Sequence, residues 1–418
     1  MLSLAAAYLR RQPLSSALTV LLVALGVATL TVLLLLARQA EQTLAAGEGV
    51  DLVVGAEGSP LQLVLSAVYH LDRPTGNIPG GVLDSLRGHR AVARAVPLAL
   101  GDSYGGVRIV GTDTSFVAMA GARIAEGEAW GAVGEAVVGV RAAEAAGIAV
   151  GDTLVSAHGL SAETVAYGHD ETPLRVVGRL APTGGPADGL ILTSVETVWA
   201  LHGIGDAVVM PPMPGEMPPQ APDSAVMPPM PPGAGDGRDL TAVLVQVASP
   251  LAVALLPREV AAWPGTQAAV PAREATRLLS LVGVGLGVLR LFGAALLAAA
   301  LLSLFLALTA AMRQRRTDLA VLRALGASRG RLVTLVLAEG LAIAAAGVVL
   351  GLALGHAAVE AVARLAPAVG PTAPLTGWTW APAEGAVVAA AFAVALVASA
   401  WPAWAAYRTD VAATLAEA

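Results

Sequence analysis

Paired methionines in a proline-rich segment are the first side chains in this sequence that could do chemistry. The segment around residues 210–232 contains two similar strings, VMPPMPGEMPP and AVMPPMPPG. A polyproline II helix has three residues per turn, so methionines three apart share an edge, and paired thioethers suit copper(I). Copper(I) capture is therefore one interpretation, and a tolerated proline-rich loop is the other. The methionines concerned are Met210, Met213, Met227 and Met230.

No other pattern in the sequence points to catalysis or metal binding. The chain has no cysteine and no lysine, which excludes disulfides, thiolate metal sites and the lysine of a P-loop ATPase. The histidines show no ligand spacing, and the acidic residues form no pair that periodicity would bring together. We therefore expect no catalytic residue and no cofactor bound by this chain, and expect any ATP to be hydrolysed by another polypeptide.

A short basic segment between two long apolar runs is the most informative part of the sequence. Between residues 313 and 331, six arginines accompany a single acid, Asp318. Short loops rich in positive charge remain cytoplasmic during membrane insertion, so this loop is expected on the cytoplasmic side. The arginines are Arg313, Arg315, Arg316, Arg323, Arg329 and Arg331.

The interior of this basic segment is patterned as a short amphipathic helix. Leu319, Leu322 and Leu325 recur at three-residue spacing, Gly326 is placed to end the helix, and Ser328 is placed to cap the next one. The apolar edge needs a cover, which is either the lipid headgroup region or a groove on a cytoplasmic partner. Spacing alone does not choose between these two.

Two strings in the chain resemble a known family. RRTDLAVLRALGASRGRL (315–332), followed by Glu339 and a glycine repeat, resembles the signature of FtsX-like ABC permeases, the group that includes MacB-like exporters and lipoprotein-releasing permeases. VVGVRAAEAAGIAVGDTL (137–154) resembles the periplasmic core domain of the same family. The glycines, spaced by four, present a smooth face for a neighbouring helix of the same chain or of a homodimer. They are Gly347, Gly351 and Gly355.

The resemblance implies a division of labour between subunits. The basic loop would be a coupling helix gripped by a separate ABC ATPase subunit, which binds ATP and Mg, and two copies of the permease would pair. A periplasmic adaptor or substrate-binding partner would be a further component, and net charge of -6 gives no case for nucleic acid. The residues assigned to ATPase coupling are Arg316, Asp318, Leu319, Leu322, Arg323, Leu325, Gly326 and Arg329.

Composition identifies the chain as an integral membrane protein. Of 418 residues, 56% are hydrophobic and 13% are charged, whereas soluble domains carry about 25% charged residues. Four apolar runs are long enough to cross a bilayer. The predicted order is a first transmembrane helix with a stalk extension (1–46), a periplasmic α+β domain (47–270), a stalk and second transmembrane helix (271–311), the coupling helix (312–331), a third transmembrane helix (332–363), an outer loop (364–382), a fourth transmembrane helix (383–406) and a cytoplasmic tail (407–418).

The large segment before residue 270 reads as a folded α+β domain inserted between the first and second transmembrane helices. The pattern from Ser59 to Gln62 predicts a capping box with proline at the first helical position. The stalk is expected to be one helix of about forty residues, with a break near 283–287 as the alternative. Strands are expected at 107–110, 136–140, 154–157, 174–180, 190–193 and 241–247, and helices at 141–146 and 194–201.

These features predict a multi-pass protein of the bacterial inner membrane with both termini in the cytoplasm. Its expected function is that of a permease subunit that couples cytoplasmic ATP hydrolysis to movement of its periplasmic domain, exporting or extracting a substrate. One alternative is a mechanotransmitter that activates a periplasmic partner such as a cell-wall hydrolase. Another is a membrane-anchored copper-binding module.

Overall fold

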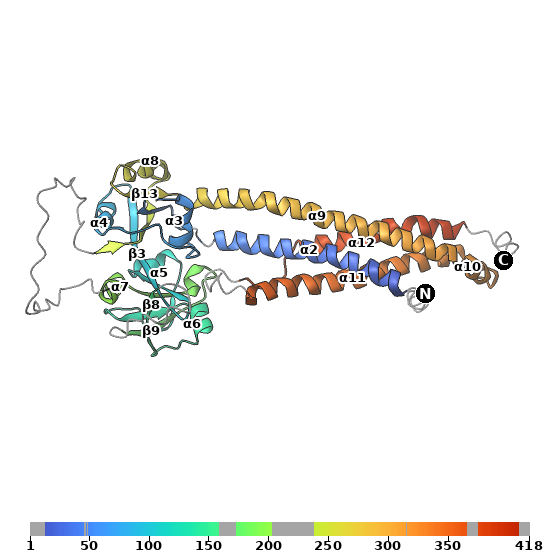
Figure 1. Ribbon diagram of the computed structural model, residues 1–418, viewed down its shortest axis with the longest axis horizontal. Coiled ribbons are helices and arrows are strands. Elements are labelled where there is room, and N and C mark those ends of the chain that lie inside the picture. Colours follow the sequence, from blue (N-terminus) through green and yellow to red (C-terminus); the bar gives the residue numbers. More distant parts are fainter. Residues whose placement is uncertain are drawn as a thin grey trace, which may run out of the picture. The chain divides into compact units, whose positions relative to one another are not determined.

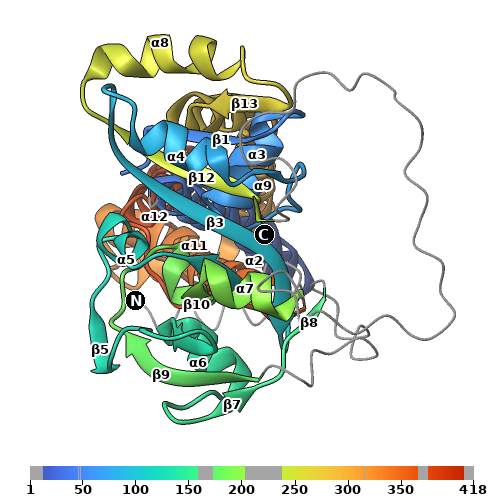
Figure 2. The ribbon, with the colours of Figure 1, turned by 90° about the vertical axis from the view of Figure 1, so that its left-hand side faces the viewer.

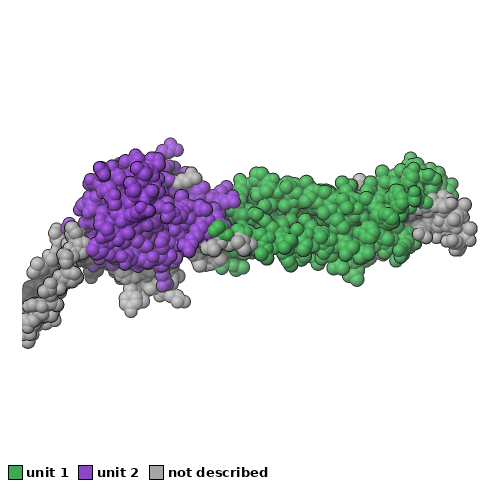
Figure 3. Space-filling view, turned by 90° about the horizontal axis from the view of Figure 1, so that it is seen from above, with its two compact units in different colours: residues 1–40, 280–366, 375–418 green, residues 41–279, 367–374 purple. Residues whose placement is uncertain are grey.

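The computed structural model describes residues 13–45, 47, 49–158, 173–202, 238–314, 316–365 and 375–408. The chain divides into two compact units, which Figure 3 shows in different colours. Unit 1 consists of residues 1–40, 280–366 and 375–418, and unit 2 consists of residues 41–279 and 367–374. Each unit is described by itself.

Unit 1 is built from long apolar helices that lie side by side (Figure 1). Within the described residues, four helices are long and apolar enough to cross a membrane. The shortest, α12, has 24 residues and is about 36 Å long at ~1.5 Å per residue, which exceeds the ~30 Å core of a bilayer. The helices are α2 (Pro13–Ala45), α9 (Pro271–Gln314), the short α10 (Arg316–Ala324), α11 (Arg329–Leu365) and α12 (Glu384–Tyr407).

The second long helix, α9, is continuous over 44 residues. The break that the sequence allowed near 283–287 is not found. Gly283, Gly285 and Gly287 weaken a helix by up to ~1 kcal/mol each in water, but this part of the helix is flanked by apolar residues. An interruption here would leave backbone N–H and C=O groups unpaired, which also costs free energy, and the hydrogen-bonded helix is retained.

Helix α11 contributes to both main cores of unit 1. At one level its Leu335 and Ile343 pack with Leu304 and Leu308 of α9 and with small residues of α12. At another level its Val348 packs with residues of α2, α9 and α12. Glu339 of α11 is also buried.

Unit 2 contains an α+β fold around one large, mostly antiparallel sheet. The strand order is β13-β1-β12-β3-β4-β10-β6-β9-β5, and only the β4–β10 and β6–β9 pairs are parallel. Strands that form this sheet are β1 (Leu52–Ala56), β3 (Val92–Tyr104), β4 (Val107–Thr112), β5 (Ile124–Gly127), β6 (Glu135–Val138), β7 (Thr153–Leu154), β8 (Ala157–His158), β9 (Leu174–Leu180), β10 (Leu190–Ser194), β12 (Ala242–Val247) and β13 (Thr266–Ala269).

Short helices cover the sheet, and a separate two-stranded ladder joins β2 to β11. These elements are α3 (Pro60–Ala67), β2 (Ile78–Pro79), α4 (Gly81–Arg87), α5 (Ser115–Met119), α6 (Val140–Ala146), the 3-10 turn Pro186–Gly189, α7 (Val195–Leu201), β11 (Asp239–Leu240) and α8 (Pro250–Val260).

The 13-residue strand β3 connects two halves of unit 2 (Figure 2). Its first part pairs with β12, where Leu98 lies opposite Ala242, and its second part pairs with β4, where Ala99 lies opposite Gly111. Three cores result. One is beneath α3 and α5, one is beneath α4 and α8, and one is beneath α6.

Most strands expected from the sequence occur in unit 2. One expected strand and one expected helix cap differ in detail. The run 154–157 is not one strand, because β7 ends at Leu154 and β8 begins at Ala157, and each pairs with a different neighbour. The capping box at α3 is half formed. Ser59 accepts a hydrogen bond from the Gln62 backbone N–H at 3.4 Å, but the Gln62 side chain donates to the Arg73 carbonyl instead.

A buried histidine makes unit 2 sensitive to acid. His70 is 4% exposed, and its Nδ1 has no hydrogen-bond partner among the described residues. It has a left-handed backbone, with φ at +55°. Burial, together with the nearby positive charge of Arg108, lowers the pKa of His70 from 6.5 to about 3. The folded unit therefore keeps His70 neutral where the unfolded chain would protonate it.

We expect the stability of unit 2 to fall as the pH is lowered from 6.5 towards 3. In this window the unfolded state binds more protons than the folded state, so the free energy of unfolding decreases by about 1.4 kcal/mol per pH unit for this one group. His70→Asn is a suitable variant, because Asn tolerates the left-handed region and does not titrate. Hydrogen exchange of unit 2 peptides in the full chain should show a shallower pH dependence in this variant. An unchanged slope would contradict the assignment.

Candidate coupling site

The short helix α10 ends in a well-defined turn. The backbone N–H of Ala327 donates to the Leu322 carbonyl and that of Gly326 donates to the Arg323 carbonyl, both at 3.0 Å. This pair of bonds is a Schellman motif, which requires a left-handed residue, and Gly326 has φ at +96°. Ser328 then accepts from the Arg331 N–H at 3.4 Å. The predicted helix stop and cap are therefore confirmed.

The apolar residues of α10, and Leu325 directly after it, differ in how far they are buried. Leu322 packs against the core of unit 1 that contains Leu308 and Leu335, and Ala320 is fully buried. Leu325 is 80% exposed and Val321 is 44% exposed. Because Val321 and Leu325 are four residues apart, they lie on the same side of the helix. Of the leucines in the sequence pattern, Leu322 is therefore partly buried in the core and Leu325 is available to a partner.

Close to α10, the first residue of α11 contacts the last residue of α12. The guanidinium of Arg329 lies over the ring of Tyr407 at 5.4 Å, and that of Arg408 lies over the ring of Trp404 at 4.2 Å. Trp401 packs beside Trp404. Exposed tryptophans and tyrosines followed by arginine are typical of a membrane interface. The basic loop thus lies at a boundary between apolar helices and water.

The three glycines of α11 are in contact with α2 of the same chain. A Cβ at Gly351 would lie 2.7 Å from the Ala24 carbonyl oxygen. The corresponding positions at Gly347 and Gly355 would meet Val23 and Thr31 of α2. The smooth face is therefore covered within the chain.

The opposite end of unit 1 carries a polar cluster centred on a buried carboxylate. Glu384 has no exposed surface. One of its oxygens lies 3.1 Å from His356 Nε2 and the other accepts the Ala381 N–H at 3.0 Å. His356 also faces the Gly377 carbonyl at 2.5 Å. Glu360 accepts the Gly377 N–H at 3.1 Å.

Helix α2 is hydrogen-bonded to the segment 376–384 that precedes α12 and includes its first residue. Gln39 exchanges two hydrogen bonds with the backbone of Thr376, at 2.8 and 2.9 Å, and Arg38 donates to the Trp380 carbonyl at 2.8 Å. Residues 376–384 therefore connect the ends of α2, α11 and α12. Sequence reasoning missed this cluster, although ionisable residues near the ends of apolar helices are a usable signal.

The remaining predicted site residues are less fully described. Arg316, Asp318 and Leu319 lie in α10, but the structure describes only their backbone. Arg323 is half buried and Arg329 is exposed. Met210, Met213, Met227 and Met230 lie outside the described residues. Within the described residues, no group of three or more His, Cys, Asp or Glu side chains could hold a metal ion.

Two family models together match most of the chain. The MacB-like periplasmic core domain matches residues 16–261, and the FtsX-like permease C-terminal matches residues 290–411. This chain belongs to the FtsX/MacB-like ABC permeases. Members of this family are transmembrane components of ABC systems in which the ATPase is a separate subunit, so the chain is an ABC transporter permease subunit of the bacterial inner membrane that associates with a cytoplasmic ATPase.

Two solved structures align with about half of the chain at low similarity. The extracellular domain of the noncanonic ABC-type transporter YknZ from Gram-positive bacteria has 12% identity and a TM-score of 0.30, covering 52% of this chain and 98% of that one. The periplasmic region of MacB from Actinobacillus actinomycetemcomitans has 9% identity and a TM-score of 0.33, covering 55% and 94%. No curated protein sequence matches.

Proposed function

We propose that this permease converts ATP-driven movement of its cytoplasmic partner into movement of an extracytoplasmic domain, and thereby exports or extracts a substrate. The observation that carries the proposal is an exposed apolar pair bordered by arginines, formed by Val321 of α10 and by Leu325, which directly follows this helix. A partner groove would cover this pair, whereas an isolated soluble loop would leave it in water. ATP and Mg would be bound by the partner, with no cofactor in this chain.

Unit 2 would lie outside the cytoplasm, inserted between the first and second transmembrane helices. The element order supports this arrangement, because β1 to β13 follow α2 and precede α9. The arginine-rich loop after α9 would remain cytoplasmic, together with both chain termini. Movement would pass along helices whose ends are tied together, since residues 376–384 bond to α2 and α11 and lead directly into α12.

Two copies of the permease would pair as a homodimer in the assembled transporter. Helix α9 is the least covered of the four membrane helices, with 28% of its most apolar stretch buried against 39–50% for the others. It is therefore the surface that we assign to a second copy. The glycine face of α11 does not serve this purpose, because α2 already covers it.

Two other functions use the same parts differently. A mechanotransmitter would transfer the same movement to a periplasmic partner such as a cell-wall hydrolase. Association with a periplasmic adaptor would favour export over this role. A copper-binding module would depend on the methionine-rich segment 210–232 alone and would need neither α10 nor an ATPase.

The proposed topology can be tested directly because the chain contains no cysteine. Gly330→Cys lies beside the coupling helix and Glu196→Cys lies on α7 of unit 2, and both positions are exposed. A membrane-impermeant maleimide should label Glu196→Cys in spheroplasts and Gly330→Cys only in inside-out vesicles. Labelling of both positions from the same side would overturn the proposal.

A further inference from the structure

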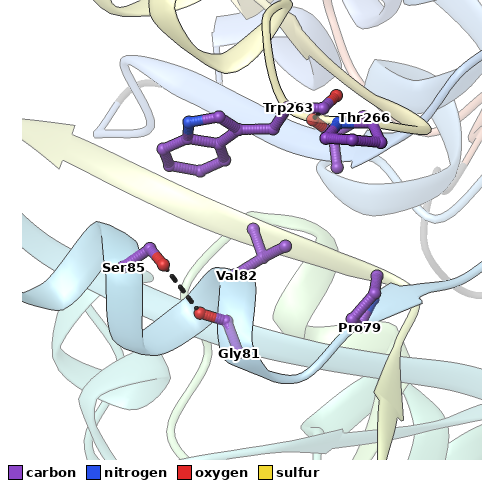
Figure 4. Close-up of a pocket in the computed structure, with 7 residues that line it drawn as sticks. Pro79, Gly81, Val82, Ser85, Trp263 and Thr266 are labelled. Carbon is purple, nitrogen blue, oxygen red and sulfur yellow. Dashed lines mark hydrogen bonds between the residues drawn. The ribbon is translucent and has the colours of Figure 1, made fainter. Parts of the chain in front are cut away.

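A pocket of about 250 Å³ opens in unit 2 between the turn after α8 and the start of α4 (Figure 4). One wall is the indole ring of Trp263, and the facing wall is formed by Val82 and Ser85 of α4. Pro79, at the end of β2, and Pro264 also line it. All of its lining residues belong to unit 2, and the proposed coupling does not use them.

The turn that carries Trp263 holds the indole wall in place. Thr266 is buried, and its hydroxyl donates to the carbonyls of Val260 and Trp263, at 2.9 and 3.0 Å. The backbone N–H of Trp263 donates to the Val260 carbonyl at 2.9 Å, and Gly265 supplies the left-handed φ of +69° that closes the turn. The backbone that carries the indole is therefore held by this turn before any ligand arrives.

The facing wall is also fixed. Val82 is 6% exposed and belongs to the core beneath α4 and α8. Ser85 Oγ donates to the Gly81 carbonyl at 2.9 Å. Pro79 is held by pairing with Asp239 in the β2–β11 ladder. The gap across which Trp263 faces α4 is thus set by two independently anchored elements.

The side chains that line the pocket disfavour charged ligands and favour ligands with a flat ring. Among the residues that the structure describes, no charged side chain lines the pocket, and the hydroxyl groups of Ser85 and Thr266 already donate within the protein. An ionised group placed here would lose water without gaining an oppositely charged partner, which costs several kcal/mol. The exposed face of an indole instead favours stacking of another ring. The volume is below the ~300–1,000 Å³ of pockets for drug-sized molecules, so it suits a single ring.

We propose that this pocket binds a small, uncharged, mainly apolar ring compound, stacked on the indole of Trp263. The ligand would be a free small molecule. A tyrosine or proline ring presented by a peptide is the competing occupant, and the experiment distinguishes the two. Binding does not require the ATPase, so it can succeed or fail independently of the proposed function.

The test uses the full chain in lipid nanodiscs and ligand-detected NMR with three matched probes. Benzyl alcohol should bind, whereas benzoate and benzylammonium, which have the same ring with a charge, should bind at least tenfold more weakly. Nanodiscs without protein correct for partition into lipid. Two variants assign the signal to the pocket. Trp263→Ala removes the stacking wall, and Ser85→Phe fills the pocket from an exposed position without touching the core. Both should reduce binding at least tenfold.

Three results would overturn the proposal. The first is binding of benzyl alcohol that neither variant changes. The second is binding of benzoate as strong as that of the neutral probe. The third is binding of a capped Ala-Tyr-Ala peptide without binding of benzyl alcohol, which would make the pocket a peptide-docking site. Unchanged hydrogen exchange in β12 of each variant confirms that unit 2 remains folded.

Discussion

Replacing Leu325 by Asp should abolish capture of the partner ATPase while the helical unit stays folded. The side chain is 80% exposed, so its loss removes little from the core. A leucine that becomes buried at an interface contributes about 1.5–3 kcal/mol, which corresponds to roughly a tenfold to a hundredfold change in Kd. Burying an ionised carboxylate in the same apolar groove adds a desolvation cost. The measurement is the amount of ATPase that co-purifies with the tagged chain, followed by titration in nanodiscs.

Leu322 provides the matched control on the same helix. Because it packs into the core with Leu308 and Leu335, Leu322→Ala should lower the free energy of unfolding by about 1–2 kcal/mol, less than the 2–5 of a fully buried leucine. The remaining folded protein should bind the ATPase normally. Leu325→Asp protein that binds like the wild type, or a selective loss of binding in Leu322→Ala without loss of stability, would show that α10 docks through a different face.

Replacing Gly351 by Ala should destabilise unit 1 strongly for so small a change. The added methyl carbon would lie 2.7 Å from both the Ala24 carbonyl oxygen and Val27 Cβ. Backbone atoms of a helix cannot move aside as a flexible side chain can, so α2 and α11 must separate locally. Overpacking of this kind costs about 1–3 kcal/mol. Thermal or denaturant unfolding in one detergent measures the effect.

Gly285 in α9 is the matched control position, where the same change to alanine should raise stability. Nothing lies within 4 Å of a Cβ built there. Gly285→Ala therefore gains the helix preference of alanine, about 0.5–1 kcal/mol, without a steric cost. The same substitution should thus have opposite signs in α11 and α9. If both variants lose or both gain stability, close packing of α11 on α2 is not what the glycine repeat provides.

The sequence by itself determined the class of the protein and much of its layout. Apolar runs longer than a bilayer is thick have few alternatives to a membrane helix, because an unpaired backbone group costs several kcal/mol in lipid. The absence of lysine removed the P-loop chemistry without any structure. Gly326 marked the end of α10 because few other residues adopt the left-handed backbone that a Schellman motif needs.

Tertiary structure alone decided which side chains are available to a partner and which are not. Leu322 and Leu325 look equivalent by spacing, yet one packs into the core and the other faces outward. The contact of Gly351 with α2, the burial of Glu384 beside His356 and the facing walls of the Trp263 pocket also join residues far apart in the chain. Periodicity shows which residues share a face of one element. Which neighbour covers that face depends on packing between elements, and no local pattern contains that information.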